Sequence, residues 1–70
     1  MSIANDITFT PYLLDPVSKI AFRIAIVEGR IRIYGKAKGG KEHWAPSDDH
    51  YFERAEMLDA YISEEEYENY

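Results

Sequence analysis

Hydrophobic and polar residues alternate along the middle of the chain, as they do in β-strands that bury one face. The alternation is clearest in residues 20–27 and 30–38, which are separated only by Glu28-Gly29. A two-residue loop that contains glycine is typical of a tight antiparallel hairpin. The sequence therefore predicts a central hairpin over residues 20–38.

The two-residue loop also predicts the register of this hairpin, because it places Val27 opposite Arg30. One face is then apolar, with Ile20, Phe22, Ile24 and Ile26 opposite Ala37, Gly35, Ile33 and Ile31. The other face is basic and carries Arg23, Arg30, Arg32, Tyr34 and Lys36. We expect the apolar face to pack in the core and the basic face to be exposed to solvent.

A third strand is predicted over residues 41–45, because the turn signal Gly39-Gly40 directly follows the hairpin. The tightest pairing across this turn would place Trp44 beside Gly35 on the apolar face. An aromatic ring over a strand glycine fills the space that the missing side chain leaves. The same register would place His43 on the basic face.

Residues 7–10 also alternate, and they lie between Asn5-Asp6 and Pro11, so they are predicted to form another strand. Asp15-Pro16 then marks a bend that leads into the hairpin. The sheet is therefore expected to have three to four antiparallel strands.

After Pro46 the spacing of apolar residues changes to three and four, which is typical of an amphipathic helix. The apolar stripe consists of Tyr51, Ala55, Leu58 and Ile62, widened by Phe52, Met57 and Tyr61. Favourable cap residues at Ser47, Asp48 and Asp49 predict a helix start between positions 48 and 53. The alternative is a short strand at residues 50–52, with the helix beginning near Arg54.

Ser63 and Glu66 have the spacing of a capping box, so residues 64–70 are either a second short helix or a frayed acidic tail. The predicted fold is α+β in a single domain over residues 1–70. It consists of a small antiparallel sheet, with the 20–38 hairpin central, packed by one C-terminal amphipathic helix.

A chain of 70 residues is near the lower limit at which one core keeps a domain folded, so a homo-oligomer or a stabilising partner fits its size. The sequence has no cysteine, which excludes disulfides and thiolate metal sites. It also has no signal-peptide pattern and no apolar run of about 20 residues. We therefore expect a cytoplasmic protein with no membrane association.

The residues that support catalysis are sparse, since His43 and His50 are the only histidines. Together with Asp48 and Asp49 they offer metal-binding side chains, but their spacing matches no recognised metal site. The Gly39-Gly40 pair lies between two predicted strands and is better explained as a turn than as a phosphate loop. We expect no enzymatic activity, no cofactor and no metal.

Basic and acidic residues are segregated along the chain, which suggests two surfaces of opposite charge. Residues 19–41 contain seven basic residues and one acid, whereas residues 42–70 contain ten acids and one basic residue. The basic hairpin face with Tyr34 has the composition of a single-strand nucleic-acid binder. The nearby acidic residues would repel nucleic acid, so a nucleic-acid partner is the less favoured interpretation.

The acidic half predicts a surface that contacts a basic partner protein. Its candidate contact residues are Asp48, Asp49, Glu53, Glu56, Asp59, Glu64, Glu65, Glu66, Tyr67 and Glu68. Acids at the end of a helix oppose its dipole, and tyrosine is favoured at protein interfaces, so this end is a candidate for contact with a partner.

In size, charge and lack of cysteine, with acids from Asp48-Asp49 through Glu68, the chain resembles small phage-encoded inhibitors of the anti-CRISPR and anti-restriction type. The resemblance implies an inhibitor that occludes a nucleic-acid groove of a host complex in the host cell cytoplasm. The clustered cations depart from the profile of a DNA mimic. The resemblance is therefore equally compatible with contact through the basic sheet.

Two other functions are compatible with the segregated charge. In one, the basic hairpin binds nucleic acid and the acidic tail screens it until a target displaces the tail. In the other, the protein is a structural subunit in which the basic face of one copy contacts the acidic face of the next. Such a heterologous contact would build rings or filaments.

Overall fold

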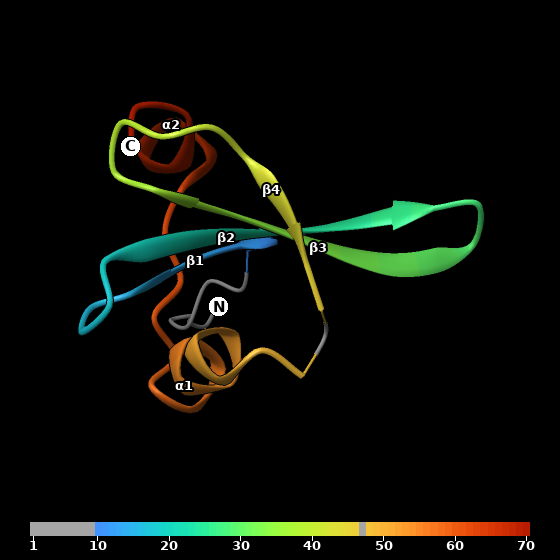
Figure 1. Ribbon diagram of the computed structural model, residues 1–70, viewed down its shortest axis with the longest axis horizontal. Helices are drawn as coiled ribbons and strands as arrows, with labels where there is room; N and C mark the ends of the chain where they lie inside the picture. Colours follow the sequence, from blue (N-terminus) through green and yellow to red (C-terminus); the bar gives the residue numbers. More distant parts are fainter. Residues whose placement is uncertain (1–9, 47) are drawn as a thin grey trace, which may run out of the picture.

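The computed structural model of the protein describes residues 10–46 and 48–70. Its elements are β1 (Tyr12–Asp15), β2 (Ile20–Val27), β3 (Arg30–Ala37), β4 (His43–Ala45), α1 (His50–Met57) and α2 (Glu64–Glu68). The strands form one antiparallel sheet in the order β1-β2-β3-β4 (Figure 1). The predicted α+β fold with a central hairpin is confirmed.

The hairpin of β2 and β3 has the predicted register, with Val27 opposite Arg30 and Phe22 opposite Gly35. Both residues of the turn have positive φ angles, 54° at Glu28 and 76° at Gly29. Two positive φ angles define the type I′ turn, whose twist matches that of the flanking strands. The local sequence is therefore sufficient to align these two strands.

The predicted register of β4 is wrong by one residue. Tyr34 lies opposite Trp44 and Gly35 opposite His43, because the connection after Gly39-Gly40 is not the tight loop that the prediction assumed. A shift of one residue sends every side chain to the other face. Trp44 is therefore 64 % exposed, on the face opposite the core.

The space beside Gly35 is filled by Phe22 and not by the tryptophan. A Cβ atom built on Gly35 would lie 3.1 Å from Cε1 of the Phe22 ring. This ring also packs edge-on against Phe52 of α1, with 5.5 Å between the ring centroids. Phe22 therefore occupies the centre of the core, between the sheet and the helix.

The second neighbour of β2 is β1, a segment that the sequence did not predict to be a strand. Residues 7–9 of the predicted strand lie outside the described residues, and Thr10 precedes β1 without belonging to it. The pairing segment is Tyr12–Asp15, with Leu13 opposite Phe22. The segment after α1 adds to the free edge of β1, since the Leu14 N–H bonds to the Ala60 carbonyl at 2.9 Å.

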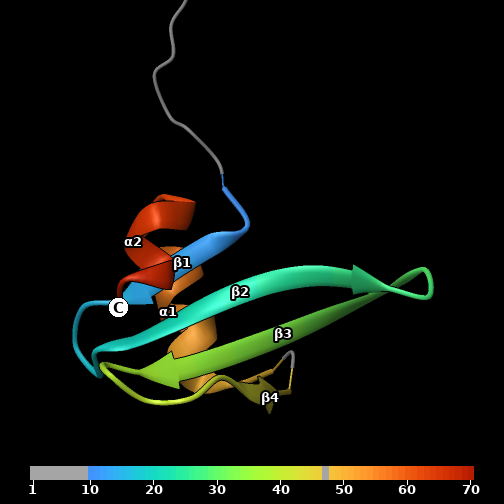
Figure 2. The ribbon, with the colours of Figure 1, turned by 90° about the horizontal axis from the view of Figure 1, so that it is seen from above.

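The two helices lie on opposite faces of the sheet, as Figures 1 and 2 show from two directions. Phe52 and Ala55 of α1 pack against the core face, whereas Tyr67 of α2 stacks on Tyr12 with 5.1 Å between the ring centroids. Tyr12 precedes the core residue Leu13 in β1, and neighbouring strand residues point to opposite faces. The prediction of a single packing helix is therefore incomplete.

The start of α1 lies within the predicted window, and Asp49 caps it. The helix ends earlier than the apolar stripe predicted. Asp59 adopts a left-handed φ of 50°, and the Ala60 N–H bonds back to the Ala55 carbonyl at 3.0 Å. This is a Schellman ending. Of the predicted stripe, Tyr51, Met57 and Leu58 are exposed, while Phe52 and Ala55 are buried.

Residues 64–68 form a short helix rather than a frayed tail. The predicted capping box is present, since the Ser63 hydroxyl accepts from the Glu66 N–H and the Glu66 carboxylate accepts from the Ser63 N–H. Two tyrosines attach this helix to the sheet. Tyr67 is buried, and the Tyr70 hydroxyl donates to the Lys19 carbonyl at 2.6 Å.

Candidate functional site

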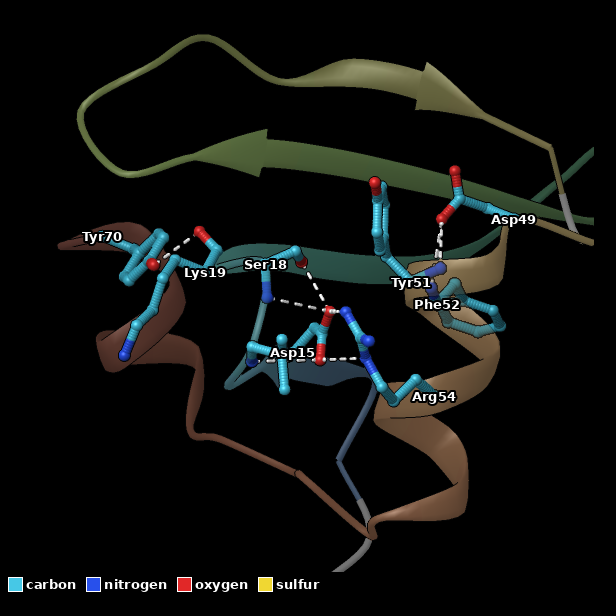
Figure 3. Close-up of polar contacts among 9 residues, drawn as sticks. Asp15, Ser18, Lys19, Asp49, Tyr51, Phe52, Arg54 and Tyr70 are labelled. Carbon is cyan, nitrogen blue, oxygen red and sulfur yellow. Dashed lines mark hydrogen bonds and ion pairs between the residues drawn. The ribbon is translucent and has the colours of Figure 1, made fainter.

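Asp15 is a fully buried charged residue at the end of β1. Its side chain is 0 % exposed, and Arg54 of α1 donates from Nε and Nη2 to its two carboxylate oxygens at 3.0 and 2.6 Å. The Ser18 hydroxyl donates at 2.5 Å, and the backbone N–H groups of Val17 and Ser18 complete the shell (Figure 3). These hydrogen bonds, first those from Arg54, hold the pKa of Asp15 well below its ordinary range.

The Asp15–Arg54 pair fixes the position of α1 on the sheet. Phe52 and Ala55 bury one side of the helix, and the Asp49 carboxylate accepts from the N–H groups of its first turn at 2.9 and 3.1 Å (Figure 3). A helix held by its core side, its cap and an ion pair has little freedom to rotate. The remaining side chains of α1 are therefore presented in a fixed arrangement.

Those remaining side chains include a line of acids. Asp49, Glu53 and Glu56 are spaced by four and three residues, which places them along one side of a helix. We call these three residues the acidic stripe. Glu53 and Glu56 are exposed, while Asp49 is half-buried and serves as the cap. Two further predicted contact residues, Asp48 and Asp59, are exposed at the two ends of the stripe.

The acids of α2 lie on the other side of the sheet, so the fold does not join the predicted acidic residues into one surface. Exposed acids of this second group are Glu64, Glu65, Glu66 and Glu68. Tyr67 was predicted to contact a partner, but it is only 4 % exposed. Its ring packs against the sheet, so it supports the helix from within.

In the described part of the chain, no cation forms an ion pair with the acidic stripe. Within residues 10–46 and 48–70, the side-chain ion pairs at 4 Å or less are Arg23–Glu42 and Arg54–Asp15. Both acids of these pairs belong to the sheet or to its loops. Glu53 and Glu56 therefore remain available for a basic partner.

The basic face is covered at one end, contrary to the expectation that solvent covers it. Arg23 donates two hydrogen bonds to Glu42 at 2.8 and 2.9 Å, and the Tyr67 hydroxyl donates to the same carboxylate at 2.6 Å. The Lys36 ammonium lies 4.4 Å from the centre of the Tyr67 ring. These contacts satisfy Arg23 and Lys36 within the fold.

The other residues of the basic face lie nearer the hairpin turn. Arg30 is exposed, and the Arg32 guanidinium lies 5.9 Å from the centre of the Trp44 ring. Tyr34 is half-buried under Arg23, at 4.6 Å. His43 lies on the opposite face, beside Gly35, and not on the basic face as predicted. Of the five residues that define the basic face, Arg30, beside the turn, is exposed and the other four are half-buried.

Acid is expected to destabilise this protein through its two carboxylate pairs. Hydrogen bonds, chiefly from Arg23, lower the pKa of Glu42 from 4.5 to about 2, and the pKa of Asp15 is lower still. When the folded pKa lies below the unfolded one, the unfolded state binds protons first as pH falls. The stability that ionised Asp15 and Glu42 confer at neutral pH is therefore lost progressively as the pH falls below about 4.5, until the folded pKa of each carboxyl is passed.

The midpoint of urea unfolding, measured from neutral pH down to about pH 2, tests this expectation. Glu42→Gln is expected to make the dependence shallower, because one of the two titrating carboxylates is then absent. A midpoint that stays constant across this range would contradict the expectation that ionised Asp15 and Glu42 stabilise the fold.

Asp15, Arg54 and Glu42 were not predicted from the sequence as residues that organise the surface. Asp15 and Arg54 are 39 residues apart, and Arg23 and Glu42 are 19 apart. The one local signal was the Asp15-Pro16 turn with Ser18 three residues on, which favours hydrogen bonds from the turn to the Asp15 carboxylate. Nothing local indicated which cation would complete each pair.

Among the described residues, no helix is long and apolar enough to cross a membrane, and no three histidine or acidic side chains gather as metal ligands. Comparisons with protein families, with curated proteins and with solved structures found no match to this chain.

Proposed function

We propose that this protein is a small, non-enzymatic inhibitor that binds the basic surface of another protein through its acidic stripe. The proposal rests on the exposure of Glu53 and Glu56 on a helix that is held in a fixed position. Neither carboxylate takes part in the two ion pairs found among the described residues. Groups that are already positioned lose little conformational entropy on binding. Complementary charge adds specificity and speeds association.

Basic surfaces on proteins can hold nucleic acid by contacts to its phosphates, which suggests how binding would inhibit. Carboxylates along a helix can replace phosphates against arginine and lysine side chains. The partner proposed is therefore a nucleic-acid-handling complex. A phage-encoded inhibitor acting in the host cell cytoplasm, as the resemblance implies, would have this activity.

The test uses the full chain, immobilised and exposed to a lysate of the cells in which it acts. A basic, nucleic-acid-binding protein should be captured, and the addition of the free chain should reduce the binding of nucleic acid by that protein. Glu53→Lys with Glu56→Lys is expected to abolish capture, because like charges then face each other. Both positions are exposed, so the double variant should fold normally.

The matched control is Glu65→Lys with Glu68→Lys, which makes the same change of net charge on α2. Capture that survives in this control and is lost in the α1 variant supports the acidic stripe. Equal capture by the wild type and the α1 variant would refute it.

A further inference from the structure

The end of the β2–β3 hairpin projects beyond both helices and beyond β4, as Figures 1 and 2 show. We call residues 24–32 the hairpin arm. Ile26 and Ile31 lie opposite each other in the arm and are 76 % and 68 % exposed. The arm therefore carries an exposed pair of large aliphatic side chains.

One edge of the arm is open. In the described part of the chain, β4 pairs with β3 only at residues 33–35, so residues 30–32 have no neighbouring strand on that side. β4 ends at Ala45, and the following Pro46 has no N–H with which to extend the ladder. The edge therefore becomes available where β4 stops.

The alternation of the ladder determines which backbone groups face this edge. The Ile24 N–H bonds to the Pro11 carbonyl at 2.7 Å, so it points away from β3. In an antiparallel pair, such outward-facing positions recur at every second residue. The outward-facing pairs are thus Ile24 with Ile33 and Ile26 with Ile31. The N–H and C=O groups of Ile31 therefore point toward the open edge.

The same edge borders a hollow of about 240 Å³. Its lining consists of Arg30, Ile31, Arg32, Ile33, Trp44 and Ala45. The two arginines share a face of the strand with Trp44, and Ile31 points to the other face. The site thus offers a backbone donor and acceptor, two cations and an apolar side chain in a fixed order.

We propose that the open edge at residues 30–32 binds an extended acidic segment of a partner protein, which adds to the sheet as a strand. The residue opposite Ile31 would be apolar, and its two neighbours, opposite Arg30 and Arg32, would be acidic. Backbone hydrogen bonds supply affinity in such strand addition, and alternate side chains supply specificity. This site is separate from the acidic stripe and does not depend on the function proposed for it.

A second copy of this chain fits the edge poorly. Antiparallel pairing of two arms about Ile31 would place Arg30 of each copy opposite Arg32 of the other. Like charges directly opposite each other destabilise a strand pair. Within the arm, Glu28 is the only acid, so no group of the arm offsets this repulsion. Charge complementarity therefore favours an acidic strand.

The test is an NMR titration of the ¹⁵N-labelled full chain with the blocked peptide Ser-Glu-Val-Glu-Ser. We expect the amide signals of residues 30–32 to shift and hydrogen exchange at Ile31 to slow. A peptide that is N-methylated at valine should not bind, because that N–H faces the edge. A peptide N-methylated at the second glutamate, whose N–H points away, should still bind.

Arg30→Ala with Arg32→Ala is expected to weaken binding roughly tenfold. The matched control, Lys38→Ala with Lys41→Ala, removes the same charge elsewhere and should change the affinity less than about twofold. Equal binding of both N-methylated peptides would overturn strand addition. The proposal would also fail if an oligo-dT strand produced these shifts and the peptide did not, or if the free chain formed a dimer that protected the Ile31 amide.

Discussion

Replacing Asp15 with asparagine is expected to lower the free energy of unfolding by about 3 kcal/mol, because the buried charge of the Asp15–Arg54 pair is removed. Asparagine keeps the shape of the side chain but presents an N–H₂ group to surrounding donors. A domain of 70 residues has a total stability of roughly 4–10 kcal/mol. The variant should therefore unfold at a much lower urea concentration, as measured by far-ultraviolet circular dichroism.

The matched control for this substitution is Asp48→Asn, which removes the same charge from an exposed side chain. Its unfolding midpoint should match that of the wild type, since exposed substitutions change stability by only about 0.5 kcal/mol. Asp15→Asn should also make the acid dependence of stability shallower. Equal midpoints for the two variants would show that the buried pair contributes little to the fold.

Replacing Phe22 with alanine is expected to lower the free energy of unfolding by about 4 kcal/mol, which is a large part of the total stability of a domain of this size. The ring is 2 % exposed and connects three parts of the core: β1 through Leu13, β3 through Gly35 and α1 through Phe52. Its removal leaves a cavity that these backbones cannot close without moving. Denaturant unfolding measures the loss.

Ile26→Ala is the matched control, because this residue belongs to the same strand and face but lies on the exposed arm. We expect its stability to stay within about 0.5 kcal/mol of the wild type. A second check is Gly35→Ala, whose added Cβ would crowd the Phe22 ring. Gly35→Ala should destabilise the wild type more than it destabilises the Phe22→Leu variant. An equal loss of stability in both would show that residues 22 and 35 are not in contact.

Patterns within a few residues of each other predicted much of the fold correctly. The alternation in residues 20–38 and the Glu28-Gly29 turn predicted the hairpin and its register, and Ser63 with Glu66 predicted a capping box, with a second short helix as one of two alternatives. Each of these features depends on hydrogen bonds between close neighbours in the chain. The register of β4 failed because the loop before it is not a tight turn, and a one-residue error inverts both faces.

The candidate sites were less predictable, because they depend on which charges the fold neutralises. Sequence reasoning grouped all acids of residues 42–70 together, but the sheet separates those of α1 from those of α2. It also treated Arg23 and Lys36 as exposed cations, whereas Glu42 and Tyr67 engage them. The open edge at Arg30–Arg32 could not be predicted, since it depends on where β4 ends.

The sequence by itself determined the strands of the hairpin, the capping box of Ser63 and Glu66 and the segregation of charge along the chain, because each of these is a property of neighbouring residues. The tertiary structure decided which face α2 covers, which carboxylates are buried with arginine, and which charges remain free. Those outcomes depend on contacts between residues as far apart as Asp15 and Arg54, which are brought together only when the sheet and both helices pack. The physical reason is that an ion pair's contribution depends on its burial and partner geometry, and neither is encoded in local spacing.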